Sequence, residues 1–432
     1  MAPPPPPIPI IPVKAVSPYM GVAEKVMLQC DELGTISSMF PQVCRLYLTP
    51  EHAKCNKVVA GWMETAGMET WQDQAGNIWG RYRASESNAR TLVLGSHLDT
   101  VPNAGKYDGV LGVLVAIEAI NQLHDKGIRL PFNVDIVGFG DEEGSRFGTT
   151  LLGSRAVAGT WKPEWMDLVD KQSVKMADAL KDFGCDPELL HTASRTEDDI
   201  FGYMEVHIEQ GPMLEGHNQP LGIVPSIAGA RRFLVTISGK AGHAGTVPMN
   251  MRQDALVAAA SAVHMVEQIA NRFQIVATVG QLQCYPGAPN VIPGSCQFSI
   301  DIRSGRDQTR DVAVDTIQKQ LQEMVDERRM TIEWKEIHSA PAVECASWIQ
   351  RLMEDVAIKM DLEPLSIVSG AGHDAMSIAE FTDIGMLFVR CGGGGISHHP
   401  DESVITEDVA VAIDALGKTL VRVAEDKLYL PP

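Results

Sequence analysis

The sequence predicts an α/β protein: a catalytic domain with a mostly parallel central sheet flanked by helices, and an inserted α+β domain with an antiparallel sheet. Two observations predict this fold class. Short continuous apolar runs, typical of strands buried on both faces, alternate with helix-like segments in the first and last parts of the chain. Between those parts, apolar and polar side chains alternate along the candidate strands, as expected for strands with one solvated face.

The catalytic domain is expected to comprise residues 21–221 and 339–432. Its helices are predicted from apolar residues recurring every three or four positions, and its buried strands from apolar runs too short for a helix. In chain order these segments are the helices 22–33 and 50–66, the strands 76–82 and 91–96, the helix 111–123, the strands 132–139 and 385–389, and a closing helix. Strand, helix and strand in this order favour a parallel sheet.

The inserted domain is expected at residues 222–338. Its segments are a strand at 232–238, a helix at 254–270, strands at 274–283 and 295–303, a helix at 311–327 and a strand at 331–337. This order suits an antiparallel sheet with two helices on one face. An insertion that the chain enters and leaves at two crossings favours a hinged lid.

Composition restricts the partners and the location. The net charge of −19 argues against nucleic acid and anionic membranes as partners. No apolar stretch approaches the roughly 20 residues that span a bilayer. The eight cysteines lack C-x-x-C spacing, which favours reduced cysteines in a cytoplasmic enzyme. The proline-rich start, residues 1–20, is expected to be an extended or disordered arm without signal-peptide features.

Candidate metal ligands follow the predicted strands. His97 and Asp99 lie just beyond one buried strand, Asp108 lies in the loop after it, and Glu142-Glu143 follows the next buried strand. His207 lies in a strand-like segment, and His398 follows another buried strand. Open α/β sheets carry their sites at these strand ends. Such nitrogen and oxygen donors suit zinc, manganese or cobalt. A single His or Glu-Glu pair is more often a surface feature, but five donors beside glycines rarely coincide by accident.

Five motifs in this order resemble those of a family of dinuclear metal amidases. They are GSHLDT at 95–100, YDG at 107–109, DEEGSRF at 141–147, HIEQG at 207–211 and GISH at 395–398. The family includes allantoate amidohydrolase, ureidoglycolate amidohydrolase and N-carbamoyl-L-amino acid hydrolase, and is related to aminoacylases and carboxypeptidases. The resemblance runs from about residue 30 to the end of the chain.

The resemblance implies two divalent metal ions, with Mn expected and Zn or Co as alternatives. One would be held by His97 and His207 and the other by Glu143 and His398, with Asp108 bridging them. Glu142 would be the general base, passing a proton from water to the leaving nitrogen. Asp99 could accept the second ring N–H of His97. His399 stands beside the assigned ligand and is expected to be only its neighbour.

The resemblance also implies substrate-binding residues. His243, in the GHAGTVPM segment, would reach across a homodimer formed through the inserted domain and stabilise the tetrahedral intermediate. Asn290 and Arg303 match substrate-binding positions, and Arg303 could clamp a carboxylate with two parallel hydrogen bonds, although a strand-end ion pair is its ordinary alternative. Gln210 and His373 are expected near the pocket, His373 with an undecided role.

The implied reaction is hydrolysis of a carbamoyl (ureido) C–N bond in a ureido carboxylate. The stretches 243–254 and 369–390 look most like allantoate amidohydrolase, which would release ammonia and carbon dioxide, leave ureidoglycine and serve purine catabolism. N-carbamoyl-L-amino acid hydrolase and ureidoglycolate amidohydrolase are the nearest alternatives. A dipeptidase, an aminoacylase or an inactive binding protein would share the motifs, but complete retention of the ligands and Glu142 argues against an inactive relative.

Overall fold

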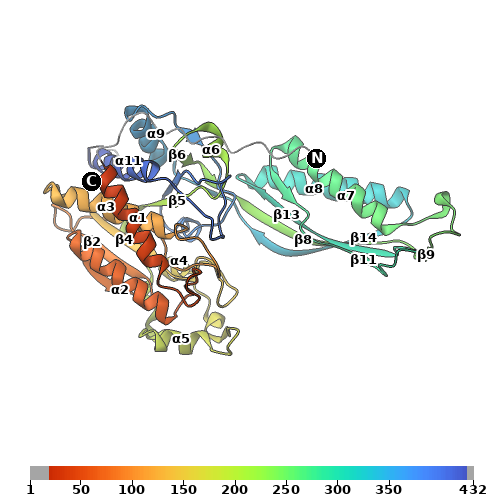
Figure 1. Cartoon of the computed structure of the whole chain (residues 1–432), viewed down its shortest axis with the longest axis horizontal. Coiled ribbons are helices and arrows are strands. Elements are labelled where there is room, and N and C mark those ends of the chain that lie inside the picture. Colours follow the sequence, from red (N-terminus) through yellow and green to blue (C-terminus); the bar gives the residue numbers. More distant parts are fainter. Residues whose placement is uncertain (1–18, 426–432) are drawn as a thin grey trace. The chain divides into compact units, whose positions relative to one another are not determined.

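The computed structural model describes residues 19–425, which form two compact units (Figure 1). Within the described residues, unit 1 comprises residues 19–225, Cys345–Ile367 and 373–425, and unit 2 comprises Ser226–Glu344 and Val368–Gly372. Unit 2 thus takes in residues 368–372, which the sequence patterns grouped with the C-terminal part of the chain. All but the last two residues of the predicted proline-rich arm lie outside the described residues.

Unit 1 is an α/β unit, and its larger elements agree in type with those predicted. Its strands are β1 (Glu69–Gln72), β2 (Ile78–Tyr82), β3 (Thr91–His97), β4 (Asn133–Phe139), β5 (Ile200–Ile208), β6 (Leu221–Val224), β16 (Leu365–Ser366) and β17 (Ile384–Val389). Its α-helices are α1 (Met20–Gly34), α2 (Pro50–Thr65), α3 (Val110–Asp125), α4 (Leu152–Val157), α5 (Met176–Asp182), α6 (Met213–His217), α9 (Ser347–Lys359), α10 (Ala375–Ile378) and α11 (Thr406–Glu425). Two 3₁₀ helices, η1 (Pro163–Asp167) and η2 (Pro187–Ala193), complete it.

The strands of unit 1 form one sheet in the order β1-β2-β4-β3-β5-β17-β6-β16. The four central strands, β4, β3, β5 and β17, are mutually parallel. At one side β1 and β2 run antiparallel to their neighbours, and at the other β6 is antiparallel to β17 but parallel to β16. Every residue of β3, β5 and β17 is buried, which explains their continuous apolar character. The predicted fold class, a mostly parallel central sheet with flanking helices, is confirmed.

The main core of unit 1 lies between this sheet and a layer of helices. Side chains of α1, α3, α9 and α11 pack together and against β3 and β5 in one hydrophobic cluster. A charged pair is buried near this layer: Arg390 donates to both carboxylate oxygens of Asp408, at 2.6 and 2.8 Å, and to Asn218. Arg390 directly follows β17, so this pair fixes the point where the chain leaves the strand.

Unit 2 is built from short strands and two long helices. Its strands are β7 (Ser226–Ile227), β8 (Gly229–Ser238), β9 (Gly242–His243), β10 (Val276–Thr278), β11 (Leu282–Tyr285), β12 (Val291–Ile292), β13 (Ser295–Ser304), β14 (Thr331–Ala340) and β15 (Val343–Glu344). Its helices are η3 (Met249–Met251), α7 (Ala255–Phe273) and α8 (Asp307–Glu327). The single strand expected at 274–283 is wrong in detail, because the chain forms two strands there with Gly280 between them.

The main sheet of unit 2 is antiparallel, in the order β10-β13-β8-β14, with β11 also paired to β13. Helices α7 and α8 pack on one face of this sheet, where alternate residues of β8 and β13 form the second hydrophobic core (Figure 1). The alternation of apolar and polar residues in the sequence is therefore explained by burial of one face of the sheet.

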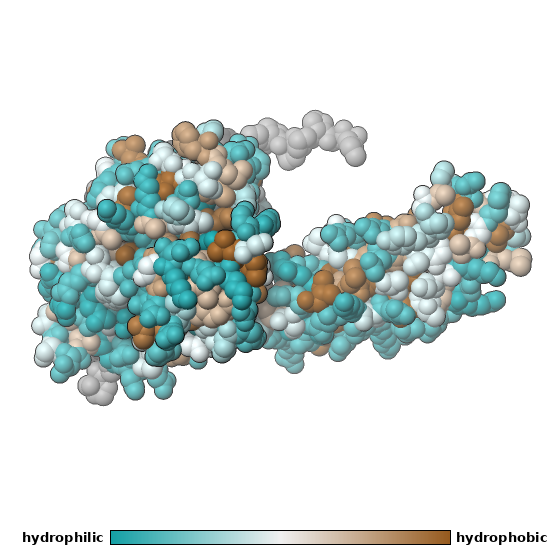
Figure 2. Space-filling view, turned by 90° about the horizontal axis from the view of Figure 1, so that it is seen from below, coloured by the Kyte–Doolittle hydropathy of each residue, from teal (hydrophilic) through white to brown (hydrophobic). Residues whose placement is uncertain are grey.

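The surface agrees with the composition. Seen from one side, it is mostly hydrophilic, with hydrophobic residues in small scattered patches (Figure 2), as a net charge of −19 leads one to expect. Within the described residues, no helix has the length and apolar character needed to cross a membrane.

Candidate metal centre and active site

The donor side chains collect at one edge of the central sheet of unit 1. His97 is the last residue of β3, and His207 is the penultimate residue of β5. Glu142 and Glu143 follow β4, and His398 follows β17. Because these four strands are parallel neighbours, their carboxyl ends meet at one edge and bring the donors together.

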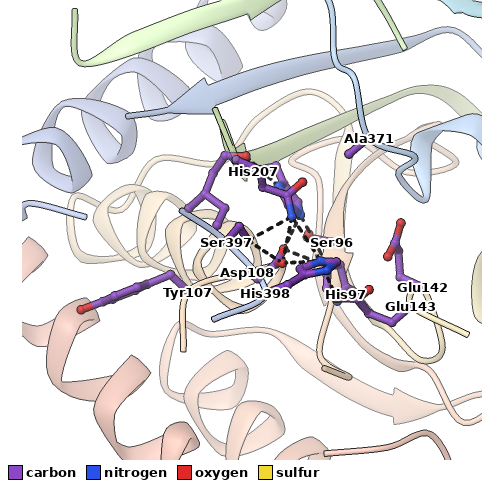
Figure 3. Close-up of polar contacts among 12 residues, drawn as sticks. Ser96, His97, Tyr107, Asp108, Glu142, Glu143, His207, Ala371, Ser397 and His398 are labelled. Carbon is purple, nitrogen blue, oxygen red and sulfur yellow. Dashed lines mark hydrogen bonds and ion pairs between the residues drawn. The ribbon is translucent and has the colours of Figure 1, made fainter. Parts of the chain in front are cut away.

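Asp108 lies at the centre of this group (Figure 3). Its Oδ1 is 3.6 Å from His97 Nε2 and 3.2 Å from His207 Nε2, whereas its Oδ2 is 3.1 Å from His398 Nε2. His398 Nε2 is also 3.3 Å from Glu143 Oε1. Each oxygen of one carboxylate therefore faces a different set of donors, as expected of a ligand shared by two metal ions.

The histidine rings are oriented with their Nε2 atoms toward Asp108. His97 Nδ1 is 3.0 Å from the Asp99 main-chain carbonyl, and His207 Nδ1 is 2.9 Å from the Ile208 carbonyl. A carbonyl only accepts hydrogen bonds, so both rings carry a hydrogen on Nδ1. Their Nε2 atoms are consequently free to coordinate a metal when the rings are neutral.

The donor set fits a divalent cation. The Nε2 atoms of His97 and His207 are 3.4 Å apart, close to the separation of two ligands that lie about 2.1 Å from a tetrahedral metal. Two Nε2–H groups could not face each other at this distance. Asp108 Oδ1, the oxygen that both rings face, is buried without a hydrogen bond within the described structure.

The electrostatics of the cluster favour positive charge. Contacts with Asp108 and Glu143 raise the pKa of His398 to about 10. Burial alone would lower the pKa of His97, but Asp108, Glu142 and Asp99 together raise it well above its usual value. Burial would raise the pKa of Asp108, yet its contacts with His207, His398 and His97 hold it well below its usual value. A site that attracts protons so strongly also attracts cations, which would displace them.

Glu142 lies beside this cluster. It shares a group of mutually close donor atoms with His97 and Glu143. Burial, followed by the charges of Glu143, Asp374 and Asp99, raises the pKa of Glu142 well above its usual value. A carboxyl group with a raised pKa can accept a proton and return it, as a general base and then acid must.

Asp99 differs in detail from the expected arrangement. Its main-chain carbonyl, and not its carboxylate, is the near partner of His97 Nδ1; Oδ1 of the carboxylate is 3.6 Å from that nitrogen. The carboxylate instead accepts the Glu142 N–H at 3.1 Å and the Glu143 N–H at 3.3 Å. Asp99 therefore positions both the His97 ring and the loop that carries the two glutamates.

Left-handed backbone conformations occur at this edge of the sheet. Asp141, Gln210 and His398 all have positive φ, at 63°, 54° and 55°. Gly109, with φ 66°, also lies here, and a Cβ atom at this position would lie 2.4 Å from the His97 ring. Non-glycine residues at positive φ cluster at functional sites, where the surrounding structure holds them in place.

Two of the predicted pocket residues of unit 1 lie beside the ligands. Gln210 donates to Asp108 Oδ2 at 2.9 Å and to Ser397 Oγ at 3.2 Å. The buried ring of His373 lies 4.5 Å from the His207 ring, and burial followed by His207 lowers its pKa well below its usual value. A neutral His373 fits a place beside cations.

The predicted substrate residues of unit 2 divide into two groups. His243 in β9 pairs with Val291 in β12, and the Asn290 carbonyl accepts the Ala244 N–H, so His243 and Asn290 are neighbours. Both adjoin the end of the main sheet where β13 begins. Arg303 lies near the other end of β13, eight residues from Ser295, or about 27 Å along an antiparallel strand. Within unit 2, Arg303 is thus remote from His243 and Asn290.

The Arg303 guanidinium is already engaged. It donates from Nε and Nη2 to the two carboxylate oxygens of Asp301, both at 3.0 Å, and from Nη1 to the Gly370 carbonyl at 2.7 Å. The ordinary alternative, a strand-end ion pair, is therefore present. A guanidinium has five N–H hydrogens, so two remain for another acceptor.

His399 does not belong to the ligand groups formed by the described residues. Its Nδ1 accepts the Asp401 N–H, and its side chain is half exposed. Sequence reasoning missed Glu205, which is fully buried and accepts hydrogen bonds from Ser96 and Tyr203. The period of two in β5, which puts Glu205 and His207 on one face, could have revealed it. Glu402 was also missed, and its neighbours in the sequence carry no such signal.

Comparison with known proteins gives a consistent result. The sequence profile of peptidase family M20/M25/M40 matches residues 93–422. "Allantoate deiminase 1" of Glycine max is 40% identical over 88% of this chain and 85% of its own length. "N-carbamoyl-L-amino-acid amidohydrolase" of Pseudomonas sp. (strain NS671) is 37% identical over 92% and 98%. An amidase of the hydantoinase/carbamoylase family from Burkholderia multivorans, a solved structure, is similar with a TM-score of 0.86 and 28% identity, over 94% of this chain and 98% of that one.

Proposed function

The chain belongs to peptidase family M20/M25/M40, and on this basis we propose that it hydrolyses a ureido C–N bond of allantoate. It is a hydrolase of the C–N bond-cleaving branch, since relatives named for allantoate, N-carbamoyl-L-amino acids and ureidoglycolate all match most of its length. Allantoate is the proposed substrate because two allantoate deiminases of Glycine max match at 40% and 39% identity. The reaction would convert allantoate and water to ureidoglycine, ammonia and carbon dioxide.

The observation that carries the proposal is that the two carboxylate oxygens of Asp108 face different ligands. His97 and His207 face its Oδ1, and His398 with Glu143 faces its Oδ2. These residues would hold two divalent ions, with Asp108 as the shared ligand. When bound, the ions would polarise the ureido carbonyl and make a water molecule more acidic.

The proton transfer is assigned to Glu142. Its neighbours and its burial keep its proton affinity high, so its carboxylate can take a proton from the attacking water and deliver it to the departing nitrogen. The Asp99 carboxylate accepts the N–H of Glu142 and of Glu143, so it is a positioning residue for this loop.

The residues of unit 2 would bind the rest of the substrate. The two N–H hydrogens that Arg303 leaves free suit a substrate carboxylate. In His243, Nδ1 accepts the Gly245 N–H, so the neutral ring carries its hydrogen on Nε2 and can donate to a developing oxyanion. Because His243 and Asn290 lie at the far end of the sheet from Arg303, we assign them to the active site of a second subunit.

Such an arrangement requires a homodimer formed through unit 2. Support comes from the exposed apolar side chains of this unit, among them Met249, Met251, Val257 and Val276. We further infer Mn as the metal and the cytoplasm as the location, since imidazole and carboxylate ligands accept Mn and the described cysteines are all free thiols. Sedimentation of the full chain tests the dimer directly.

The decisive experiment is ammonia release from allantoate, ureidoglycolate, N-carbamoyl-amino acids and N-acetyl-amino acids. The protein is stripped of metal and reconstituted with Mn. Two adjacent variants are matched controls: Glu142→Gln is expected to keep its metal and lose about 10²–10⁴-fold in rate, whereas Glu143→Gln is expected to lose metal.

The outcomes separate the parts of the proposal. Preferred turnover of allantoate supports its assignment as the substrate. Preferred turnover of N-carbamoyl-amino acids would make these compounds the substrate and leave the proposed mechanism unchanged. Hydrolysis of N-acetyl-amino acids alone would overturn the assignment of the pocket. Full activity in Glu142→Gln would overturn the assignment of the base.

A further inference from the structure

A buried carboxylate outside the ligand set connects the two loops that carry Asp108 and His398. Glu402 is 5% exposed and lies between His398 and α11 in the chain. Its Oε1 accepts the main-chain N–H of Tyr107 at 2.8 Å and of Asp108 at 3.1 Å. Its Oε2 accepts the hydroxyl of Ser397 at 2.9 Å. One side chain thus holds residues nearly 300 positions apart in the sequence.

The fold makes room for this side chain. A Cβ atom on Gly105 would lie 2.3 Å from Glu402 Oε1 and 2.4 Å from its Cβ and Cδ atoms. No positive φ requires glycine at this position. Close approach of the Glu402 carboxylate to the Asp108 loop is therefore the structural reason for glycine at position 105.

Ser397 connects Glu402 to the shared ligand. Its Oγ is 2.9 Å from Glu402 Oε2 and 3.1 Å from Asp108 Oδ2, and a hydroxyl has only one hydrogen to donate. Asp108 Oδ2 is also the oxygen that faces His398. When Ser397 donates to Glu402, this oxygen keeps a lone pair for a metal. When Ser397 donates to Asp108, it competes with the metal.

We propose that Glu402 is a positioning residue that sets the affinity of the metal centre. It holds the Asp108 main chain in place and draws the Ser397 hydrogen away from Asp108 Oδ2. This inference rests on the proposed dinuclear site, but not on the identity of the substrate. Groups of this kind, which orient ligands without binding the metal, typically change metal affinity about 10–100-fold when altered.

The test measures Mn²⁺ and Co²⁺ affinity of the metal-free full chain by competition with a chromophoric chelator, and the Co²⁺ absorption spectrum. Glu402→Gln keeps an oxygen for the two N–H groups, but its new amide donates to Ser397 and turns the Ser397 hydrogen toward Asp108. We expect about 10–100-fold weaker binding of at least one ion, and a changed Co²⁺ spectrum, with little change in the melting temperature of the metal-free protein.

Two further variants probe the same link. Gly105→Ala leaves Glu402 intact but displaces its carboxylate, so it should weaken metal binding in the same direction. Ser397→Ala removes the hydroxyl, and Glu402→Gln should then have a smaller effect in that background than alone, because the effects of coupled residues are not additive. If the losses of metal affinity in Ser397→Ala and Glu402→Gln were additive in the double variant, Glu402 would not act through Ser397.

Asp170→Asn is the matched control. Asp170 is also buried, and its Oδ1 accepts two main-chain N–H groups at 2.9 Å, from Gln172 and Val174. Its Oδ2 accepts Arg146 Nε at 2.9 Å, and it belongs to none of the ligand groups formed by the described residues. The Asp170→Asn variant should bind metal with wild-type affinity. Equal loss in Asp170→Asn, or wild-type affinity in folded Glu402→Gln, would overturn the proposal. If Glu402→Gln does not fold, wild-type affinity in Gly105→Ala would overturn it. A wild-type chain that binds no metal would instead refute the proposed dinuclear function.

Discussion

Replacing Gly109 with alanine adds one methyl group next to a proposed metal ligand. Gly109 has φ 66° and ψ −52°, and the Val110 N–H donates to the Asp108 carbonyl at 2.7 Å across it, so it is the central residue of a γ-turn. An added Cβ would lie 2.4 Å from Cδ2 and Nε2 of His97. The variant therefore strains the turn and displaces the ring.

The two effects have different sizes and different readouts. Alanine in this strained turn should cost about 1–3 kcal/mol of unfolding free energy. Ordinary contact needs about 3.5 Å, so the His97 ring must move by about 1 Å. A misplacement of that size costs about 10²-fold in rate, or about 2.7 kcal/mol of transition-state stabilisation. Metal affinity should fall together with the rate, because His97 is a proposed ligand.

The opposite end of the same helix provides the control. Gly127, just after α3, has φ 65°, but a Cβ there would meet nothing within 4 Å. Gly127→Ala should lose about 1–2 kcal/mol of stability and keep its metal affinity and activity. Urea unfolding, chelator competition and ammonia release measure the three quantities. Wild-type metal affinity in Gly109→Ala, or equal losses in both variants, would refute the reasoning.

Three other perturbations test the remaining physical claims. Arg390→Met should lose about 3–5 kcal/mol in urea unfolding because it leaves Asp408 buried and unpaired, and an added Asp408→Leu should restore most of the loss; no recovery would contradict this. Burial and Arg45 lower the pKa of His52 to about 3, below its unfolded value of about 6.5, so stability should fall as pH drops below 6.5, by about 2 kcal/mol at pH 5. His52→Gln should reduce this dependence of the unfolding free energy on pH, and an unchanged dependence would refute the role given to His52. Chelation should lower the melting temperature, and excess Mn should restore it. At a Mn concentration 100 times the dissociation constant, binding adds about 2.7 kcal/mol to the free energy of unfolding. An unaltered melting temperature would count against a metal site.

Local patterns predicted the elements that carry the site. The apolar runs at 91–96 and 132–139 correspond to β3 and β4, and the donors that follow them meet because parallel strands share one edge. The alternating stretches correspond to β8 and β13, because one face of the unit 2 sheet is packed against helices. The spacing of apolar residues follows from which side chains are buried, so it was sufficient to predict these strands.

Contacts between distant segments could not be read in this way. The insertion of β17 between β5 and β6 brings His398 to the candidate metal centre, and it depends on pairing between strands about 180 residues apart. The same holds for Glu402 and for the engagement of Arg303 by Gly370. The region 150–199 was also missed, because its helices are only five to seven residues long and carry too little periodicity.

The two proposed metal positions, which would share Asp108, carry unequal charge, and this bears on the order in which they would fill. Beside Oδ1 stand the imidazoles of His97 and His207, whereas beside Oδ2 stand one imidazole, that of His398, and a second carboxylate, that of Glu143. The position next to Glu143 should attract a dication more strongly, fill first and empty last. At limiting metal, the proposed site would then hold one ion beside Glu143 before a second ion enters beside His97 and His207.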